Sequence, residues 1–272
     1  MSTESEQSAQ LADEAATAIY AARRALGNAS SLATEAGEML GRARSGATEL
    51  RATAEQVRTA EQPRRYVLDA QDSAGFVHQK AKVGEEILAE VRGQLEIARD
   101  QLRTGRRALD ALSRIPGPET DQADDLRGRV DKLEDAVHFT GQRVTEVAGK
   151  LATARGNVEP MVIQAKDLDD LEVSSSTVSS TGTTADRNLT AAREGMADLQ
   201  REFARTNPVA SDAERDTIEL ANTMRAALNP TPNPTPNPTP NPPQNPTHQP
   251  ADPEQAAFRP RPGTSRRPTN ER

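Results

Sequence analysis

Apolar residues recur every three or four positions over most of residues 8–158, and this spacing constrains the fold more than any other feature of the sequence. Residues spaced in this way share one face of an α-helix, whereas a half-buried strand would show strict alternation. The sequence therefore predicts an all-α fold, an extended antiparallel helical bundle or coiled coil. Composition agrees, because 34% hydrophobic and 2% aromatic residues cannot fill a large mixed core but suffice for paired helices.

The first predicted helix spans about residues 8–61 and follows a short N-terminus, residues 1–7, that we expect to be disordered. Alanine dominates its apolar positions, which form three adjacent rows rather than two. A two-stranded coiled coil needs only two rows, so the wider face favours a helix that contacts more than one neighbour. Pro63 then interrupts the pattern, as either a turn or a kink.

A second helix is predicted for about residues 65–115, with leucines seven positions apart at Leu88, Leu95, Leu102 and Leu109. Such a row is typical of a dimerisation helix and is also compatible with one helix of an intramolecular hairpin, which we favour. A Pro-Gly-Pro sequence at 116–118 ends this helix, and Thr120 or Asp121 offers an N-cap for the next.

The third predicted helix, about residues 121–158, has the clearest repeat. Its apolar seam comprises Leu126, Val130, Leu133, Val137, Val144, Val147 and Leu151. β-branched residues in one row and leucines in the other favour a parallel dimer, whereas the short link to the preceding helix favours antiparallel packing within one chain. Thr140 also lies in the seam, either as a polar group that fixes register or as a tolerated small residue.

Residues 159–228 are predicted to form a linker followed by two short helices. Pro160 is expected to end the third helix, and the linker region is placed at 159–185. Within it, residues 161–173 are compatible with a last short helical piece, and the Ser/Thr-rich sequence of 174–184 indicates a flexible linker. Two helices are expected within 186–228, the second starting near Ser211, where Ser-x-x-Glu has the form of a capping box. Their inward residues are expected to be Leu189, Met196, Leu199 and Phe203, and then Ile218, Ala221, Met224 and Leu228.

The C-terminal residues 229–272 are predicted to be a disordered Pro-rich tail, because they hold 14 of the 19 prolines. The opening Asn-Pro-Thr-Pro repeats favour extended polyproline II, a semi-rigid spacer. Beyond the spacer lie arginines that would dock a partner or an anionic surface: Arg259, Arg261, Arg266 and Arg267. The alternative is a tail that serves only solubility.

Catalytic and metal-binding patterns are missing from the sequence. It contains no cysteine, its three histidines (His78, His138 and His248) are isolated from one another, and it has no phosphate-binding loop or nucleophile elbow. Adjacent carboxylates on an exposed helix are usually solvated charge, since acid/base catalysis needs a pocket that separates their pKa values. We therefore expect no enzyme activity, cofactor or metal.

The charge and hydropathy of the sequence make some classes of partner and location less favoured. A net charge of −7 makes nucleic-acid binding an unfavoured expectation, because such binding depends on clustered Lys and Arg. No apolar run approaches the roughly 20 residues that a transmembrane helix needs, and residues 1–10 lack the character of a signal peptide. The cytoplasm is the default expectation, with secretion without a cleavable signal left open. The preference for Arg over Lys suggests a GC-rich bacterial genome.

These features together favour a non-enzymatic structural or adaptor protein that acts through helix–helix assembly and protein partners, including a second copy of itself. The alternative is a stress- or secretion-linked helical protein that folds on a partner or a lipid surface, because an Ala-rich helix buries little apolar area. A DNA-associated organiser is a less favoured third hypothesis.

The leucine row gives a direct test of helix packing. Changing both Leu95 and Leu102 to Asp should abolish the bundle or the oligomer, because two charges would enter an apolar seam. Circular dichroism and sedimentation equilibrium on residues 1–228 would measure helicity and mass. Unchanged helicity and mass in the variant would contradict the hypothesis.

Overall fold

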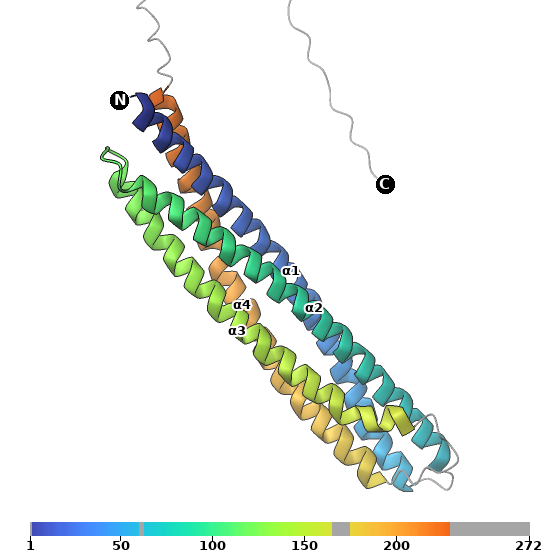
Figure 1. The fold of residues 1–272 in the computed structure, drawn as a ribbon. Coiled ribbons are helices and arrows are strands. Elements are labelled where there is room, and N and C mark those ends of the chain that lie inside the picture. Colours follow the sequence, from blue (N-terminus) through green and yellow to red (C-terminus); the bar gives the residue numbers. More distant parts are fainter. Residues whose placement is uncertain (1, 60–62, 165–174, 229–272) are drawn as a thin grey trace, which may run out of the picture. The chain divides into compact units, whose positions relative to one another are not determined.

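The computed structural model describes residues 2–59, 63–164 and 175–228. They form four long helices: α1 (Ser2–Thr59), α2 (Pro63–Leu112), α3 (Thr120–Gln164) and α4 (Ser175–Leu228). Figure 1 shows the helices side by side, each antiparallel to the one before it. The predicted all-α antiparallel bundle is therefore confirmed for the described part of the chain, and the tail at 229–272 lies outside it.

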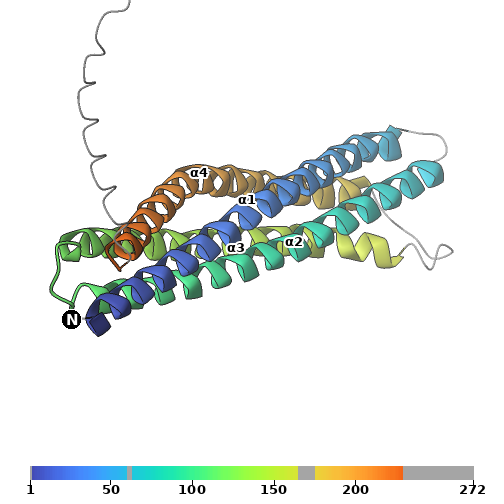
Figure 2. The same ribbon diagram turned by 90° about the horizontal axis from the view of Figure 1, so that it is seen from above.

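Each helix packs lengthwise against two others. Helix α1 contacts α2 and α4, and α3 contacts the same two helices from the opposite side of the bundle (Figure 2). This arrangement explains the third apolar row of α1, because a helix with two neighbours needs a wide apolar face. Pro63 is the first residue of α2, a position where its missing N–H costs nothing. The residues on its two sides belong to two separate antiparallel helices, α1 and α2, rather than to one kinked helix.

The core is built mainly from alanine, leucine and valine. Helix α1 contributes mostly alanine, while leucines and valines from α2 and α3 fill the space opposite. The largest fully buried side chain is Phe203 of α4. Full burial of a leucine or phenylalanine contributes about 1.5–3 kcal/mol, so these few large residues supply much of the stabilisation.

The N-terminal boundary differs from the prediction, because α1 begins at Ser2 and includes residues that we expected to be disordered. Ala9 and Ala12 are both buried, so the packing of α1 begins close to its first turns. The hydroxyl of Ser8 also donates to the Glu4 carbonyl one turn earlier, which keeps this side chain on the helix.

The predicted linker at 159–185 is wrong at both of its ends. Helix α3 continues through Pro160 to Gln164, because Met161 is buried and its packing outweighs the one backbone hydrogen bond that proline removes. Helix α4 already begins at Ser175, and Val178 is fully buried. Gly182 lies so close to α1 that a Cβ there would be 3.1 Å from the backbone nitrogen of Arg51. The rest of the predicted linker, 165–174, lies outside the described residues.

The two short helices predicted within 186–228 are one continuous helix. Pro208 lies inside α4, and Ser211 is an interior residue rather than an N-cap. The buried positions keep the same spacing on both sides of Pro208, from Phe203 to Ala213, so packing against α1 and α3 holds one helix together. The expected inward residues are buried or partly buried except Ile218, which is 41% exposed.

Two glycines in helix interiors allow the effect of helix propensity on stability to be measured apart from the effect of close packing. At Gly195 of α4 a Cβ would lie 2.8 Å from Val147 Cγ2, whereas at Gly156 of α3 it would meet nothing within 4 Å. Gly156→Ala should raise the free energy of unfolding by about 0.5–1 kcal/mol through helix propensity. Gly195→Ala should lower it, since overpacking costs about 1–3 kcal/mol. Urea denaturation of both variants measures this, and equal shifts would contradict the close contact between α3 and α4.

Candidate functional site

The predicted assembly seam lies in the core of a single chain. All eleven of its residues are at most 3% exposed: Leu88, Leu95, Leu102, Leu109, Leu126, Val130, Leu133, Val137, Val144, Val147 and Leu151. Thr140 is buried among them, and its hydroxyl donates to the Ala136 carbonyl at 2.7 Å, so its polar group is satisfied within α3. These side chains are occupied by packing between helices of one chain, and assembly of two chains through them stays a prediction.

The predicted docking arginines of the tail, Arg259, Arg261, Arg266 and Arg267, lie outside the described residues. Their role in docking stays a prediction.

Charged side chains line the contact between α2 and α3. Arg103 Nε donates to Glu134 Oε1 at 2.8 Å, and two further arginines, Arg99 and Arg106, lie 3.7 and 3.9 Å from the same carboxylate. Arg106 also pairs with Asp131 at 2.8 Å. Glu134 is only 15% exposed, so its charge is offset mainly by these arginines rather than by water. The α2 arginines thus serve first to hold α3.

The contact between α1 and α4 is organised in the same way. Asp186 of α4 accepts from Arg51 at 2.9 Å and from Arg44 at 3.5 Å. The same two helices also form the pairs Arg23–Glu214 and Asp13–Arg225. Most of these groups are partly exposed, so each pair contributes little stability and acts mainly by matching the charges of antiparallel neighbours.

Displaced pKa values occur at ion pairs on helix surfaces. The hydrogen bond from Arg58 lowers the pKa of Glu55, and the same contact raises the pKa of Arg58, in the last turns of α1. Burial by itself would lower the pKa of Arg129, but hydrogen bonds and charges from Asp125 and Asp216 outweigh it and raise that pKa. These groups neutralise one another, so none of them is a candidate acid or base for catalysis.

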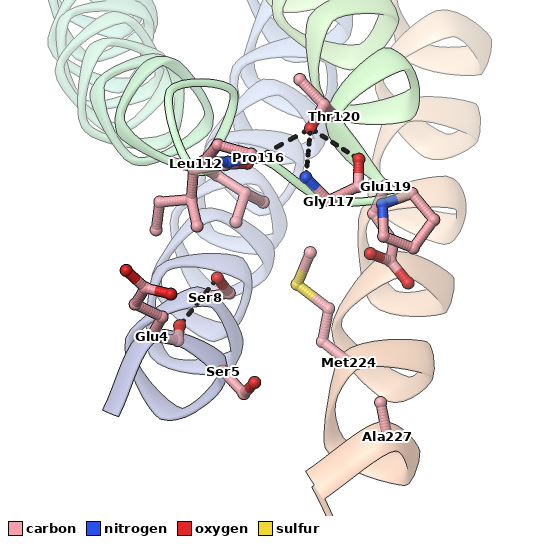
Figure 3. Close-up of a pocket in the computed structure, with 12 residues that line it drawn as sticks. Glu4, Ser5, Ser8, Leu112, Pro116, Gly117, Glu119, Thr120, Met224 and Ala227 are labelled. Atoms are coloured by element: carbon pink, nitrogen blue, oxygen red, sulfur yellow. Dashed lines mark hydrogen bonds between the residues drawn. The ribbon is translucent and has the colours of Figure 1, made fainter. Parts of the chain in front are cut away.

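A pocket of about 260 Å³ lies at the end of the bundle where α1 begins, α2 turns into α3 and α4 ends. Figure 3 shows Leu112 and Met224 lining it with apolar atoms, while Glu4 and Glu119 bring carboxylates to its edge. Thr120 holds the turn, because its hydroxyl donates to the Gly117 carbonyl at 2.8 Å and accepts from the Gly117 N–H at 3.2 Å. We call this hollow the end pocket.

The size and the lining residues of the end pocket are typical of a gap between helix ends. Its volume falls below the roughly 300–1,000 Å³ of most small-molecule sites. Its lining contains carboxylates, hydroxyls and apolar groups but no histidine, lysine or arginine. The groups in this lining that could take part in acid/base or nucleophilic chemistry are carboxylates and hydroxyls.

Within residues 2–59, 63–164 and 175–228, no three His, Asp or Glu side chains gather as a metal ion would require. None of the helices in those ranges is apolar enough over a sufficient length to cross a bilayer.

Aromatic residues are distributed unusually in this bundle. Tyr20, Phe76 and Phe139 are 46%, 42% and 61% exposed, whereas Phe203 is buried. Arg23 lies over the Tyr20 ring and Lys80 over the Phe76 ring, with distances of 5.8 and 5.4 Å to the centroids. The three exposed rings belong to α1, α2 and α3.

Sequence reasoning did not single out these surface aromatics or the end pocket. The aromatics had a usable signal, since Tyr20, Phe76 and Phe139 fall outside the apolar rows of their helices. The end pocket had none, because it forms from two helix ends and a turn that are distant in the sequence.

No protein-family model matches the sequence, and no curated protein matches it. Among solved structures, the chain has a likeness to the SmhB pore of the tripartite alpha-pore forming toxin Smh from Serratia marcescens. The TM-score is 0.24 and the identity 12%, over 84% of this chain and 81% of that chain. A TM-score this low carries no argument about fold or function, so the chain is characterised by its own geometry: a helical bundle protein.

Proposed function

We propose that this protein is a non-enzymatic structural or adaptor protein whose bundle binds a protein partner through its outer surface. The observation that carries the proposal is the exposure of Tyr20, Phe76 and Phe139 in a chain with only 2% aromatic residues. Aromatic side chains are enriched at the centres of protein interfaces, where they bury large rigid surfaces at low entropic cost.

The composition of the core strengthens this argument. An aromatic side chain buries about 150–250 Å², more than any residue used in the seams, so a chain short of apolar area would gain most by placing it inside. Here the interior relies on alanine, leucine and valine, while three aromatic rings remain at the surface. Their exposure costs the isolated chain hydrophobic stabilisation that a bound partner would restore.

The rival hypotheses receive less support. A protein that folds only on a lipid surface would need its apolar faces for the lipid, but the apolar rows of all four helices pack against one another. A DNA organiser would need free arginines. Arg23-Arg24 and Arg106-Arg107 are adjacent pairs of arginines in the described helices, and Arg23 and Arg106 of these pairs contact Glu214 and Asp131.

Circular dichroism separates the adaptor from the folding-on-contact alternative. We expect the full chain in plain buffer to be strongly helical and to lose its helix in one cooperative thermal transition, because the core closes within one chain. Anionic lipid vesicles should leave the helix signal unchanged. Helix that forms only when vesicles or lysate are added would favour the alternative.

The surface aromatics provide the direct test of partner binding. The variant Tyr20→Ser, Phe76→Ser, Phe139→Ser is compared with the control Thr48→Ser, Gln79→Ser, Thr153→Ser, which changes three exposed polar residues on the same helices. Tagged full-length proteins are crosslinked in the source cells, and co-purified proteins are quantified.

We expect a partner that is recovered equally by the wild type and the control but at least tenfold less by the aromatic variant, because interface hot spots are worth about 2 kcal/mol or more each. Matching thermal transitions would establish that the variant folds. Equal recovery by all three proteins would contradict the proposal.

A further inference from the structure

A second hollow lies between α2 and α3, away from the end pocket. It has a volume of about 200 Å³, and its floor is formed by Leu95 and Val137, both almost fully buried. Arg92, Glu96 and Arg99 of α2 stand on one side, and α3 contributes Gly141 among small and polar residues on the other. We call this the α2–α3 hollow.

Two arginines line the hollow, and in the described helices neither is fully paired with an acidic group. Within the described residues Arg92 makes no hydrogen bond or ion pair, unlike Arg103 and Arg106 further along α2. Arg99 Nε is buried without a hydrogen-bond acceptor in the described structure, since Glu134 Oε1 is 3.7 Å away. An incoming carboxylate would bind Arg92 and the accessible part of Arg99, whose side chain is 37% exposed, and would leave the buried Nε in place.

The charge balance favours a single carboxylate. Among the residues that line the hollow, the two guanidinium groups of Arg92 and Arg99 outnumber one acidic side chain, Glu96. Glu134, which Arg99 approaches at 3.7 Å, lies outside the lining and is shared with two other arginines of α2. A guanidinium binds a carboxylate through two parallel hydrogen bonds. The apolar floor of Leu95 and Val137 would contact the methylene groups next to that carboxylate, which a free phosphate lacks.

The size of the hollow suits one side chain of a larger partner rather than a whole small molecule. Small-molecule sites usually measure roughly 300–1,000 Å³, so about 200 Å³ is suited to one side chain of a polypeptide. Phe139 is 61% exposed next to His138, a residue of the hollow, and the two rings are 5.9 Å apart. A polypeptide with an acidic residue in the hollow would have an aromatic contact beside it.

We propose that the α2–α3 hollow binds a glutamate or aspartate side chain of an acidic partner polypeptide, between Arg92 and Arg99. This proposal rests on the proposed adaptor function and specifies one contact of its partner. Glu96 at the rim carries the same charge as the incoming carboxylate and would compete with it for the two arginines.

The test uses the full chain and two synthetic peptides, Ac-Gly-Leu-Glu-Glu-Leu-Gly-NH₂ and its copy with both glutamates replaced by glutamine. Nuclear magnetic resonance follows the backbone amides of Gly141 and Thr145 during titration with each peptide and with inorganic phosphate. We expect saturable shifts with the glutamate peptide and none with the glutamine copy.

Variants then locate the binding. Arg92→Gln and Arg99→Gln should each weaken the peptide about tenfold, the usual effect of losing a charge-assisted hydrogen bond. Glu96→Gln should tighten binding, and Gly141→Leu should block it by filling the hollow, since a Cβ at Gly141 meets no atom within 4 Å. Arg193→Gln, at an exposed arginine of α4, is the matched control and should change nothing.

Equal shifts with both peptides, or unchanged affinity in Arg92→Gln and Arg99→Gln, would overturn the proposal. Phosphate binding tighter than the glutamate peptide would also overturn it, in favour of a phosphate site. The Tyr20→Ser, Phe76→Ser variant leaves the hollow intact, so its peptide binding should be normal. If a partner protein is captured but the glutamate peptide does not bind, the proposal for the hollow is rejected and the adaptor function stands. If the peptide binds but no partner protein is captured, the adaptor function is rejected and the proposal for the hollow stands.

Discussion

The close packing of α1 against two neighbours is the contact on which the rest of the bundle depends. Alanines line most of its buried face, so the backbones of α2 and α4 can approach it along its length. Small side chains bring little apolar area of their own, and the stabilisation comes from leucines and valines on the opposing helices. The four helices are therefore unequal, because α1 provides a face of small side chains and its neighbours α2 and α4 bring larger buried side chains against it.

Ion pairs complement this apolar core by matching each helix to its neighbours. Arginines of α2 face Glu134 and Asp131 of α3, and arginines of α1 face Asp186 and Glu214 of α4. An apolar seam tolerates a shift of one heptad at modest cost, whereas such a shift would separate the charged groups that now pair. The charges therefore contribute more to the choice of register than to the free energy of unfolding. The α2–α3 hollow lies where this matching is incomplete.

Sequence reasoning predicted the parts of the fold that depend on local pattern. The three heptad segments gave the helices and the buried residues of α2 and α3, and the wide alanine face indicated a bundle. Besides the start of α1, the errors concern Pro160, Pro208 and the Ser/Thr-rich stretch around Gly182, where local signals for a break were outweighed by packing against other helices. The hollow was beyond reach for the same reason, since Arg92 and Gly141 are neighbours only after α2 and α3 pair.

The alanine face of α1 also shapes how the bundle responds to temperature. The heat-capacity change of unfolding rises with the apolar area exposed and falls with the polar area exposed. A helix that buries mostly methyl groups and backbone therefore adds less to that change than a helix of leucines of the same length. The stability of such a bundle varies along a shallow curve, so its helices keep their contacts over a broad range of temperature instead of being most stable near one narrow optimum.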